Sequence, residues 1–249
     1  MNALAGRRVL VTRPRAQAES LVAALEAAGA TAVLMPLIAI APPDDPGLAE
    51  AALDRLSTYD WLVITSANGA RAVGERWAAR GLLFPAGPRV AVVGPRTAVA
   101  ARAAGLPVHA QPNEFRGAAI PAALGDLHGK RVLLPRTDIG REETPDALAA
   151  AGAVVDEVVF YRTVPASVDP EAMRALRAGV DILTFMSPSA VEAFVALLGD
   201  EAVALAARAT VACIGPVTAE AARAAGLPVH VQPATYTSEA LVDALMAAS

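Results

Sequence analysis

A long segment of this chain occurs twice, and that duplication constrains the fold more than any other feature. Residues 90–124 align with residues 211–245 without a gap, and 21 of the 35 positions are identical at a constant offset of 121. The offset continues upstream, where 59–73 aligns with 180–194, and a further pair, 7–14 and 130–137, aligns at an offset of 123. In a chain of 249 residues this predicts two similar domains, each large enough to bury its own core.

Short aliphatic runs alternate with Ala-rich segments of helical period along the whole chain. Runs that are apolar on both faces are typical of parallel strands covered by helices. The predicted strands are 8–12, 31–36, 61–65, 89–93, 131–135, 154–160, 181–185 and 210–214. Helices are predicted to begin near Ala16, Gly47, Asn68, Pro95, Gly117, Arg141, Asp169, Pro188, Pro216 and Ser238. This alternation indicates an α/β fold with two similar doubly wound parallel-sheet domains and, we expect, an interdomain cleft.

The repeated units can be paired in two ways. Short β-α-β units occupy 7–36 and 130–159, and longer units occupy about 48–124 and 169–245. Either each domain is contiguous, with a boundary near Gly129, or the first short unit joins the last long unit and the middle pair forms the second domain. The second arrangement needs two crossings, near 37–41 and 160–165, and both stretches are β-prone enough to form a two-stranded tether. The repeat alone leaves both arrangements open.

Composition and motifs argue against several classes of protein. The net charge of −4 argues against a general nucleic-acid binder. No run approaches the roughly 18 apolar residues of a membrane span. The sequence lacks GxGxxG after a strand, a Walker lysine, HExxH and a Cys-x-x-Cys pair, which argues against nucleotide and metal enzymes. His109 and His230 are equivalent repeat positions, so structural roles at strand ends are expected for both, and Cys213 is expected to be a buried structural thiol.

The order of motifs resembles the uroporphyrinogen-III synthase family. The resemblance runs from one end of the chain to the other, in order and with family-like spacing. It is carried by VLVTRP (9–14), YDWLVITSANG (59–69), VAVVGPRTA (90–98), LPRTDIGRE (134–142), VVFYRT (158–163), FMSPSAV (185–191), VACIGPVTA (211–219) and GLPVHVQPATYTSEALVDAL (226–245).

The resemblance implies both a domain arrangement and a reaction. Domain one would be 1–36 plus 165–249, domain two 42–159, and the connecting strands 37–41 and 160–164. The activity implied is that of a cytoplasmic, monomeric lyase that cyclises hydroxymethylbilane to uroporphyrinogen III, with loss of water and inversion of the last pyrrole ring. No cofactor, metal, nucleic acid or membrane is implied. A transient contact with hydroxymethylbilane synthase, which makes the tetrapyrrole substrate, stays open.

The substrate of that family is a polycarboxylate, so a chain of net negative charge must supply local hydrogen-bond donors. Helix N-termini at the carboxyl ends of strands do this, and arginine binds carboxylates through two parallel hydrogen bonds. Helix capping alone would also explain the serines, and solvation alone would explain the arginines. The predicted substrate-binding residues are Thr12, Arg13, Thr65, Ser66, Asn68, Thr97, Arg136, Arg141, Ser187, Pro188, Ser189, Gly215 and Thr218.

Tyr161 is the predicted catalytic residue. It lies in the predicted tether, and the first step must expel hydroxide, which an acid assists. The departing group leaves a cation that the substrate itself stabilises, so the larger task of the protein is to hold the bilane in the reactive shape. The alternative role for Tyr161 is packing between domains. Alternative functions for the chain are a cytoplasmic two-lobed binding protein for a small anionic ligand, and a structural or interaction module.

Overall fold

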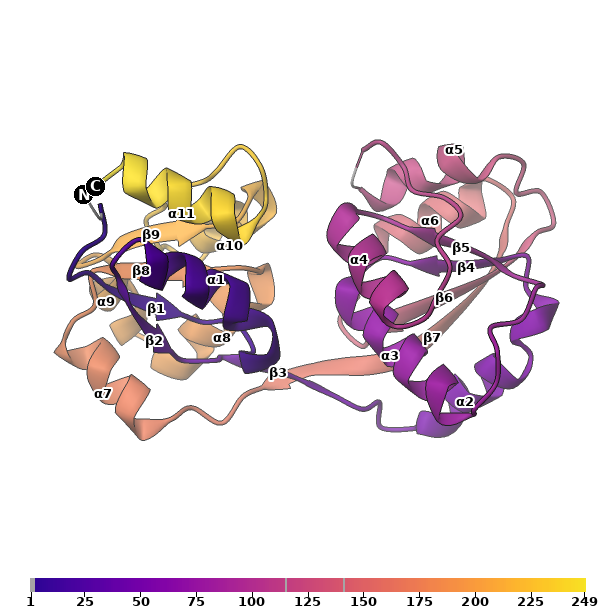
Figure 1. The fold of residues 1–249 in the computed structure, drawn as a ribbon, viewed down its shortest axis with the longest axis horizontal. Helices are drawn as coiled ribbons and strands as arrows, with labels where there is room; N and C mark the ends of the chain where they lie inside the picture. Colours follow the sequence, from indigo (N-terminus) through magenta and orange to yellow (C-terminus); the bar gives the residue numbers. More distant parts are fainter. Residues whose placement is uncertain (1–2, 115, 141) are drawn as a thin grey trace. The chain divides into compact units, whose positions relative to one another are not determined.

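The computed structural model describes residues 3–114, 116–140 and 142–249. The chain divides into two compact units, each built around its own sheet (Figure 1). Unit 1 combines the residues up to Ala39 with Val164–Ser249, and unit 2 is Ile40–Thr163.

Unit 1 is built on a four-stranded parallel sheet in the order β2-β1-β8-β9. The N-terminal segment supplies β1 (Arg8–Val11) and β2 (Thr31–Leu34), and the C-terminal segment supplies β8 (Ile182–Phe185) and β9 (Thr210–Cys213). The helices are α1 (Arg15–Ala27), α7 (Pro170–Ala178), α8 (Pro188–Leu198), α9 (Glu201–Ala206), α10 (Pro216–Ala224) and α11 (Ser238–Ala247).

Both faces of this sheet are buried because its strands are largely apolar on both sides. Leu10, Leu183 and Phe185 face a core formed with α7, α8, α9 and α10, where Phe185 packs edge-on against Phe194 at 5.3 Å between ring centroids. The alternate residues, including Val9 and Val11, face a second core formed with α1 and α11. The two layers follow from the two-residue period of a strand.

Unit 2 is built on a five-stranded sheet in the order β3-β7-β6-β4-β5. Its strands are β3 (Ile38–Ala41), β4 (Trp61–Ile64), β5 (Arg89–Val92), β6 (Arg131–Thr137) and β7 (Val154–Pro165), and β4 through β7 pair in parallel. Its helices are α2 (Pro46–Asp54), α3 (Ala67–Ala79), α4 (Pro95–Ala103), α5 (Ile120–Leu124) and α6 (Glu143–Ala150), with short 3-10 turns at Leu56–Thr58 and Gly117–Ala119.

The sheet of unit 2 also separates two cores. Leu62, Ile64 and Leu133 face α2, α3 and α4, and the aromatic residues Phe160 and Tyr161 of β7 belong to this core. Trp61, Val63 and Val132 face α5 and α6 on the other side. The helices therefore form one layer on each face of the sheet. This arrangement determines which loops lie together at the carboxyl ends of the strands.

The duplicated sequence is visible as duplicated topology. The neighbours β7-β6-β4-β5 of unit 2 correspond to β2-β1-β8-β9 of unit 1, and the isolated bridges Ala91–Ala110 and Ala212–Val231 differ by the same offset of 121. The α/β fold predicted from the sequence is confirmed, and each predicted strand is present. Gly105 and Gly226 both follow Ala-rich helices with φ of +75°, a conformation that glycine adopts without a steric penalty.

The structure adds detail to the predicted elements. The predicted connecting strand 37–41 overlaps β3, which begins at Ile38, and 160–164 is the last part of β7, which runs without a break from Val154 to Pro165. The helix α11 begins at Ser238, as predicted, and Thr237 caps it, because its side chain accepts the Ala240 N–H. The sequence analysis did not predict α9, a six-residue helix that follows α8 after Gly199 and Asp200.

The duplication also repeats a carboxylate clamp at the amino end of each sheet. Asp60 accepts the backbone N–H of Arg131 at 2.9 Å and pairs with Lys130 at 3.0 Å. Asp181 accepts the backbone N–H of Arg8 at 2.7 Å and pairs with Arg7 at 3.1 Å. In each case the pKa of the aspartate lies below its usual value. The backbone hydrogen bond is the larger cause, and the neighbouring basic side chain lowers the pKa further.

Asp181→Asn is expected to destabilise the protein by about 1 kcal/mol at neutral pH, a modest loss because water screens the pair. A depressed pKa contributes stability above the pKa of the unfolded chain and loses it as the pH falls through the folded-state value. The stabilities of wild type and variant should therefore converge below about pH 4. Thermal melts by circular dichroism at several pH values test this, and a difference that persists in acid would contradict it. Asp60→Asn is the matching variant in unit 2.

Candidate active site

The switch point of the unit 2 sheet brings several predicted residues to one place. The order β7-β6-β4-β5 means that the connections after β6 and β4 leave in opposite directions along the sheet, and ligands of such sheets bind outside the carboxyl ends of these strands. Thr65 and Ser66 follow β4, and Arg136 and Thr137 end β6. Tyr161 lies opposite Thr137 in the register of β6 and β7, at an irregularity in that pairing.

Ser66 and Tyr161 are in direct contact. The Ser66 Oγ and the Tyr161 phenol oxygen lie 2.9 Å apart. Ser66 is also the N-cap of α3, because its Oγ accepts the Gly69 N–H at 2.9 Å. With one acceptor position occupied by that amide, Ser66 can donate its own proton to the phenol oxygen, which leaves the phenol proton available to a ligand. Capping and positioning of Tyr161 are thus two functions of one hydroxyl.

The environment of Tyr161 keeps its phenol protonated. Only 7% of the residue is exposed. Burial raises the pKa of Tyr161 above its usual value, the nearby Asp138 carboxylate raises it further, and the hydrogen bond from Ser66 opposes them only in part. Asp138 is itself held by the Thr137 hydroxyl at 2.8 Å and the Thr163 N–H at 3.1 Å. A phenol in this state can donate a proton or a hydrogen bond, and it is unsuited to act as a base.

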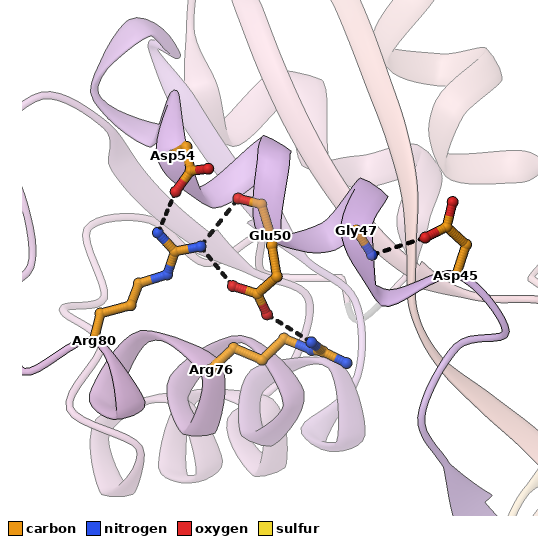
Figure 2. Close-up of polar contacts among 6 residues, drawn as sticks. All are labelled: Asp45, Gly47, Glu50, Asp54, Arg76 and Arg80. Atoms are coloured by element: carbon orange, nitrogen blue, oxygen red, sulfur yellow. Dashed lines mark hydrogen bonds and ion pairs between the residues drawn. The ribbon is translucent and has the colours of Figure 1, made fainter.

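A groove of about 590 Å³ runs along α3 beside Tyr161. It is lined by apolar residues of β3 and β7 and by charged residues of α2 and α3. Figure 2 shows those charges: Glu50 lies between Arg76 and Arg80. Its oxygens accept from Arg76 at 2.7 Å and from Arg80 at 2.5 Å, and Arg80 also contacts Asp54 at 2.5 Å.

These ion pairs connect α2 to α3, the helix that Ser66 caps. Burial disfavours the charge on Glu50, but the hydrogen bonds from Arg76 and Arg80 outweigh it and hold the pKa of Glu50 below its usual value. At the start of α2, Asp45 caps the helix by accepting the Gly47 N–H at 2.9 Å (Figure 2). The charged side chains therefore balance one another along the groove, and they support the position of α3.

Among the other residues predicted to bind substrate in unit 2, three already have structural roles. Arg136 is mostly buried and forms ion pairs with Glu142, at 2.9 Å, and with Glu157. Asn68 accepts a hydrogen bond from Arg71 at 3.1 Å. Thr97 is buried in the first turn of α4, after the N-cap Gly94. Arg141 lies outside the described residues.

Unit 1 has the corresponding loops at the carboxyl ends of its strands. Ser187 caps α8 by accepting the Ala190 N–H at 3.3 Å, and Pro188 and Ser189 begin that helix, with the two serine hydroxyls 3.0 Å apart. Thr12 is fully buried, and its hydroxyl donates to the carbonyl of Thr184 at 2.7 Å, so in this structure the side chain holds β1 to β8.

The GPVTA loop of unit 1 and Arg13 complete the predicted set. Gly215 is the N-cap of α10, and Thr218 is buried in the first turn of that helix. The ring of Tyr236 lies against Gly215, since a Cβ at that glycine would come within 3.1 Å of it, yet 51% of Tyr236 is exposed. Arg13 donates to the Gln17 side chain at 3.3 Å. From the sequence, where an aromatic residue occupies this repeat position in both halves, Tyr236 is expected to pack, and lining of the cleft is its alternative role.

The histidines and the cysteine have the structural positions expected for them. His109 Nδ1 accepts the Val90 N–H at 2.9 Å, and His230 Nδ1 accepts the Val211 N–H at the same distance. Cys213 is buried, and burial raises the pKa of its thiol to about 11. Within residues 3–114, 116–140 and 142–249, no group of three or more His, Cys, Asp or Glu side chains could hold a metal ion. In the same ranges no helix has the length and apolar character needed to span a membrane.

The fold places this chain in a class of proteins with two duplicated parallel α/β units. Capped helix N-termini lie at the strand ends of both units, and a buried tyrosine lies beside one such N-terminus in unit 2. The sequence carries no recognisable nucleotide or metal motif. A family model described as uroporphyrinogen-III synthase HemD matches residues 19–243. The chain belongs to the uroporphyrinogen-III synthase family.

Individual relatives and solved structures match this chain over nearly all of its residues. The chain is 33% identical over 251 residues to the uroporphyrinogen-III synthase of Synechococcus elongatus, a match that covers 97% of this chain and 95% of the relative. The fold is similar to that of a mutant uroporphyrinogen III synthase from Thermus thermophilus, with a TM-score of 0.67, 24% identity and 98% of each chain covered. It is also similar to the Helicobacter pylori uroporphyrinogen-III synthetase, with a TM-score of 0.63, 17% identity and coverage of 98% and 99%.

Proposed function

We propose that this protein cyclises hydroxymethylbilane to uroporphyrinogen III, with loss of water and inversion of the last pyrrole ring. Family membership supports the overall reaction, and the contact between Ser66 and Tyr161 at the carboxyl edge of the unit 2 sheet is the observation that supports a chemical role for this chain's own residues. The strand-end loops of each unit, with their helix N-termini, would receive the carboxylates of the substrate.

In the first step the bond between carbon and the hydroxyl oxygen of the hydroxymethyl group breaks. The phenol of Tyr161 donates its proton to the departing hydroxide, so that water leaves and an azafulvenium cation remains on the bilane. Ser66 stabilises the resulting phenolate by donating to its oxygen. When the last pyrrole has been attacked, inverted and closed into the ring, it loses a proton as it regains aromaticity, and that proton restores the phenol. Atoms and charges then balance with water as the only by-product.

The reaction is tested by the isomer that forms. Incubation with freshly generated hydroxymethylbilane, followed by oxidation and separation of the porphyrin isomers, should give the type III isomer. If only the type I isomer appears, as in a control without protein, the proposed reaction is wrong. Binding of the bilane without any turnover would instead favour a two-lobed binding protein for an anionic ligand.

We also propose that the protein acts in the cytoplasm as a monomer and uses no cofactor. The steps above need only an acid, hydrogen-bond donors and a binding surface. Exhaustive dialysis against a chelator is therefore expected to leave the rate of type III formation unchanged. A loss of activity that an added metal ion restores would contradict this part of the proposal.

A further inference from the structure

A second hollow in unit 2 lies on the opposite face of the sheet from Tyr161. Its volume is about 500 Å³, and it is bordered by the start of β5, the segment 109–114 and α5. Ala110, which lines the hollow, packs against the core beneath α5 and α6, to which Trp61 also belongs. Tyr161 belongs instead to the core beneath α2, α3 and α4. The sheet therefore separates this hollow from the proposed active site.

Arg89 places a positive charge in this hollow. Arg89 and Trp61 are directly opposed in the register of β5 and β4, and the guanidinium lies 4.5 Å from the centroid of the buried Trp61 ring. Among the described residues, no carboxylate forms an ion pair with Arg89. A guanidinium stacked on an indole keeps its hydrogen-bond donors in a fixed plane, which suits an anion with two oxygens.

His109 adds a donor whose proton position is set by the backbone. Its Nδ1 accepts the Val90 N–H at 2.9 Å, so the proton of the neutral ring resides on Nε2. The side-chain amides of Gln111 and Asn113 also line the hollow. Among the described residues that line the hollow, Glu114 is the one acidic residue, and it is paired with Arg116 at 2.6 Å. The hollow is therefore lined by a guanidinium, a ring N–H and two amides, while Glu114 already has a cationic partner.

Comparison with unit 1 separates the donors that both copies share from those particular to unit 2. His230 repeats the backbone contact of His109, accepting the Val211 N–H at 2.9 Å. Gln232 likewise repeats Gln111. The offset of 121, however, places Thr210 where unit 2 has Arg89, Ile182 where it has Trp61, and Ala234 where it has Asn113. The histidine contact is common to both copies, and the cation with its aromatic support is confined to unit 2.

We propose that this hollow binds a small oxyanion, a carboxylate or a phosphate, through Arg89 and the Nε2–H of His109. The site is separate from the one that carries the proposed reaction, and it requires neither the bilane nor turnover.

The three histidines of the chain allow a direct test. Imidazole proton NMR signals are followed at constant pH and ionic strength while chloride is replaced by inorganic phosphate, and in a second arm by succinate. The signal of His109 is expected to shift in a saturable manner, while those of His230 and His128 stay in place. The anion that saturates at the lower concentration identifies the class of ligand.

Arg89→Ala should raise the apparent dissociation constant about tenfold, the loss of roughly 1.4 kcal/mol expected for one charge-assisted contact, and Arg89→Lys should have an intermediate effect. Arg131→Ala is the matched control, because Arg131 also stacks on an aromatic ring, at 5.1 Å from the centroid of Tyr59, but does not line the hollow. It should bind as the wild type does. The proposal is overturned if His109 and His230 shift in parallel, if neither anion shifts His109, or if both Arg89 variants titrate like the wild type.

Discussion

Tyr161→Phe is expected to lower the rate of type III formation about a hundredfold, the lower end of what a positioned acid contributes. The substitution removes only the phenol oxygen, which contacts Ser66 at 2.9 Å, and leaves the ring in its core. Binding of the cyclic product should therefore change little. Single-turnover rates by isomer analysis, together with product binding by calorimetry, separate the two effects. Unchanged turnover would show that Tyr161 only packs.

The two capping serines supply a matched pair of controls for this prediction. Ser66 and Ser187 occupy equivalent repeat positions and cap α3 and α8, so alanine at either should cost about 1 kcal/mol of stability. Ser66 also contacts Tyr161, and Ser66→Ala alone is expected to slow the chemical step. An equal loss of rate in both serine variants would assign Ser66 to capping alone.

The raised pKa of Tyr161 further predicts that wild-type activity persists until the pH exceeds the usual tyrosine value of about 10.

Gly74→Val is expected to destabilise unit 2 by about 3 kcal/mol, although valine exceeds glycine in helix propensity. A Cβ at Gly74 would come within 2.4 Å of the Ala104 Cβ and 2.7 Å of its carbonyl oxygen, so α3 and the end of α4 would have to separate. The repeat places Val195 at the equivalent position, so the substitution simply introduces the residue of the other copy. Both tryptophans, Trp61 and Trp77, lie in unit 2, so their fluorescence in urea follows its unfolding.

Ala78→Val is the control for this prediction, since it places the same side chain at an exposed position of α3. Its cost should stay near the difference in helix propensity, about 0.5 kcal/mol. If the two variants unfold at the same urea concentration, the close approach at Gly74 has no energetic consequence.

The fold was largely predictable because its determinants are local or repeated. Short apolar runs predicted the strands, and glycines such as Gly105 and Gly226 marked helix ends. The constant offset then related one half to the other. The helix α9 was missed because it follows α8 after Gly199 and Asp200, with only six residues and no capping side chain of its own.

The candidate site was predictable residue by residue but not as a set of contacts. Ser66 and Tyr161 were each singled out, yet their contact spans 95 residues of sequence and depends on the pairing of β7 with β6. The same limit applies to Thr12 and Arg136. Their polar groups were predicted to face a ligand, and the structure gives them the partners Thr184 and Glu157 from other strands. Residue type predicts which groups a side chain can bind. Which of those groups it contacts in the folded protein depends on the tertiary pairing of the strands.

The order of the chain has a consequence for synthesis on the ribosome. Unit 2 is one uninterrupted stretch, Ile40–Thr163, and nearly all of its sheet is available as soon as that stretch has emerged. In unit 1, β1 lies between β2 and β8, and β8 is translated only after the whole of unit 2. While unit 2 folds, the N-terminal β-α-β segment therefore has one edge of β1 unpaired. During that time this segment is the part of the chain most exposed to aggregation and to chaperone binding.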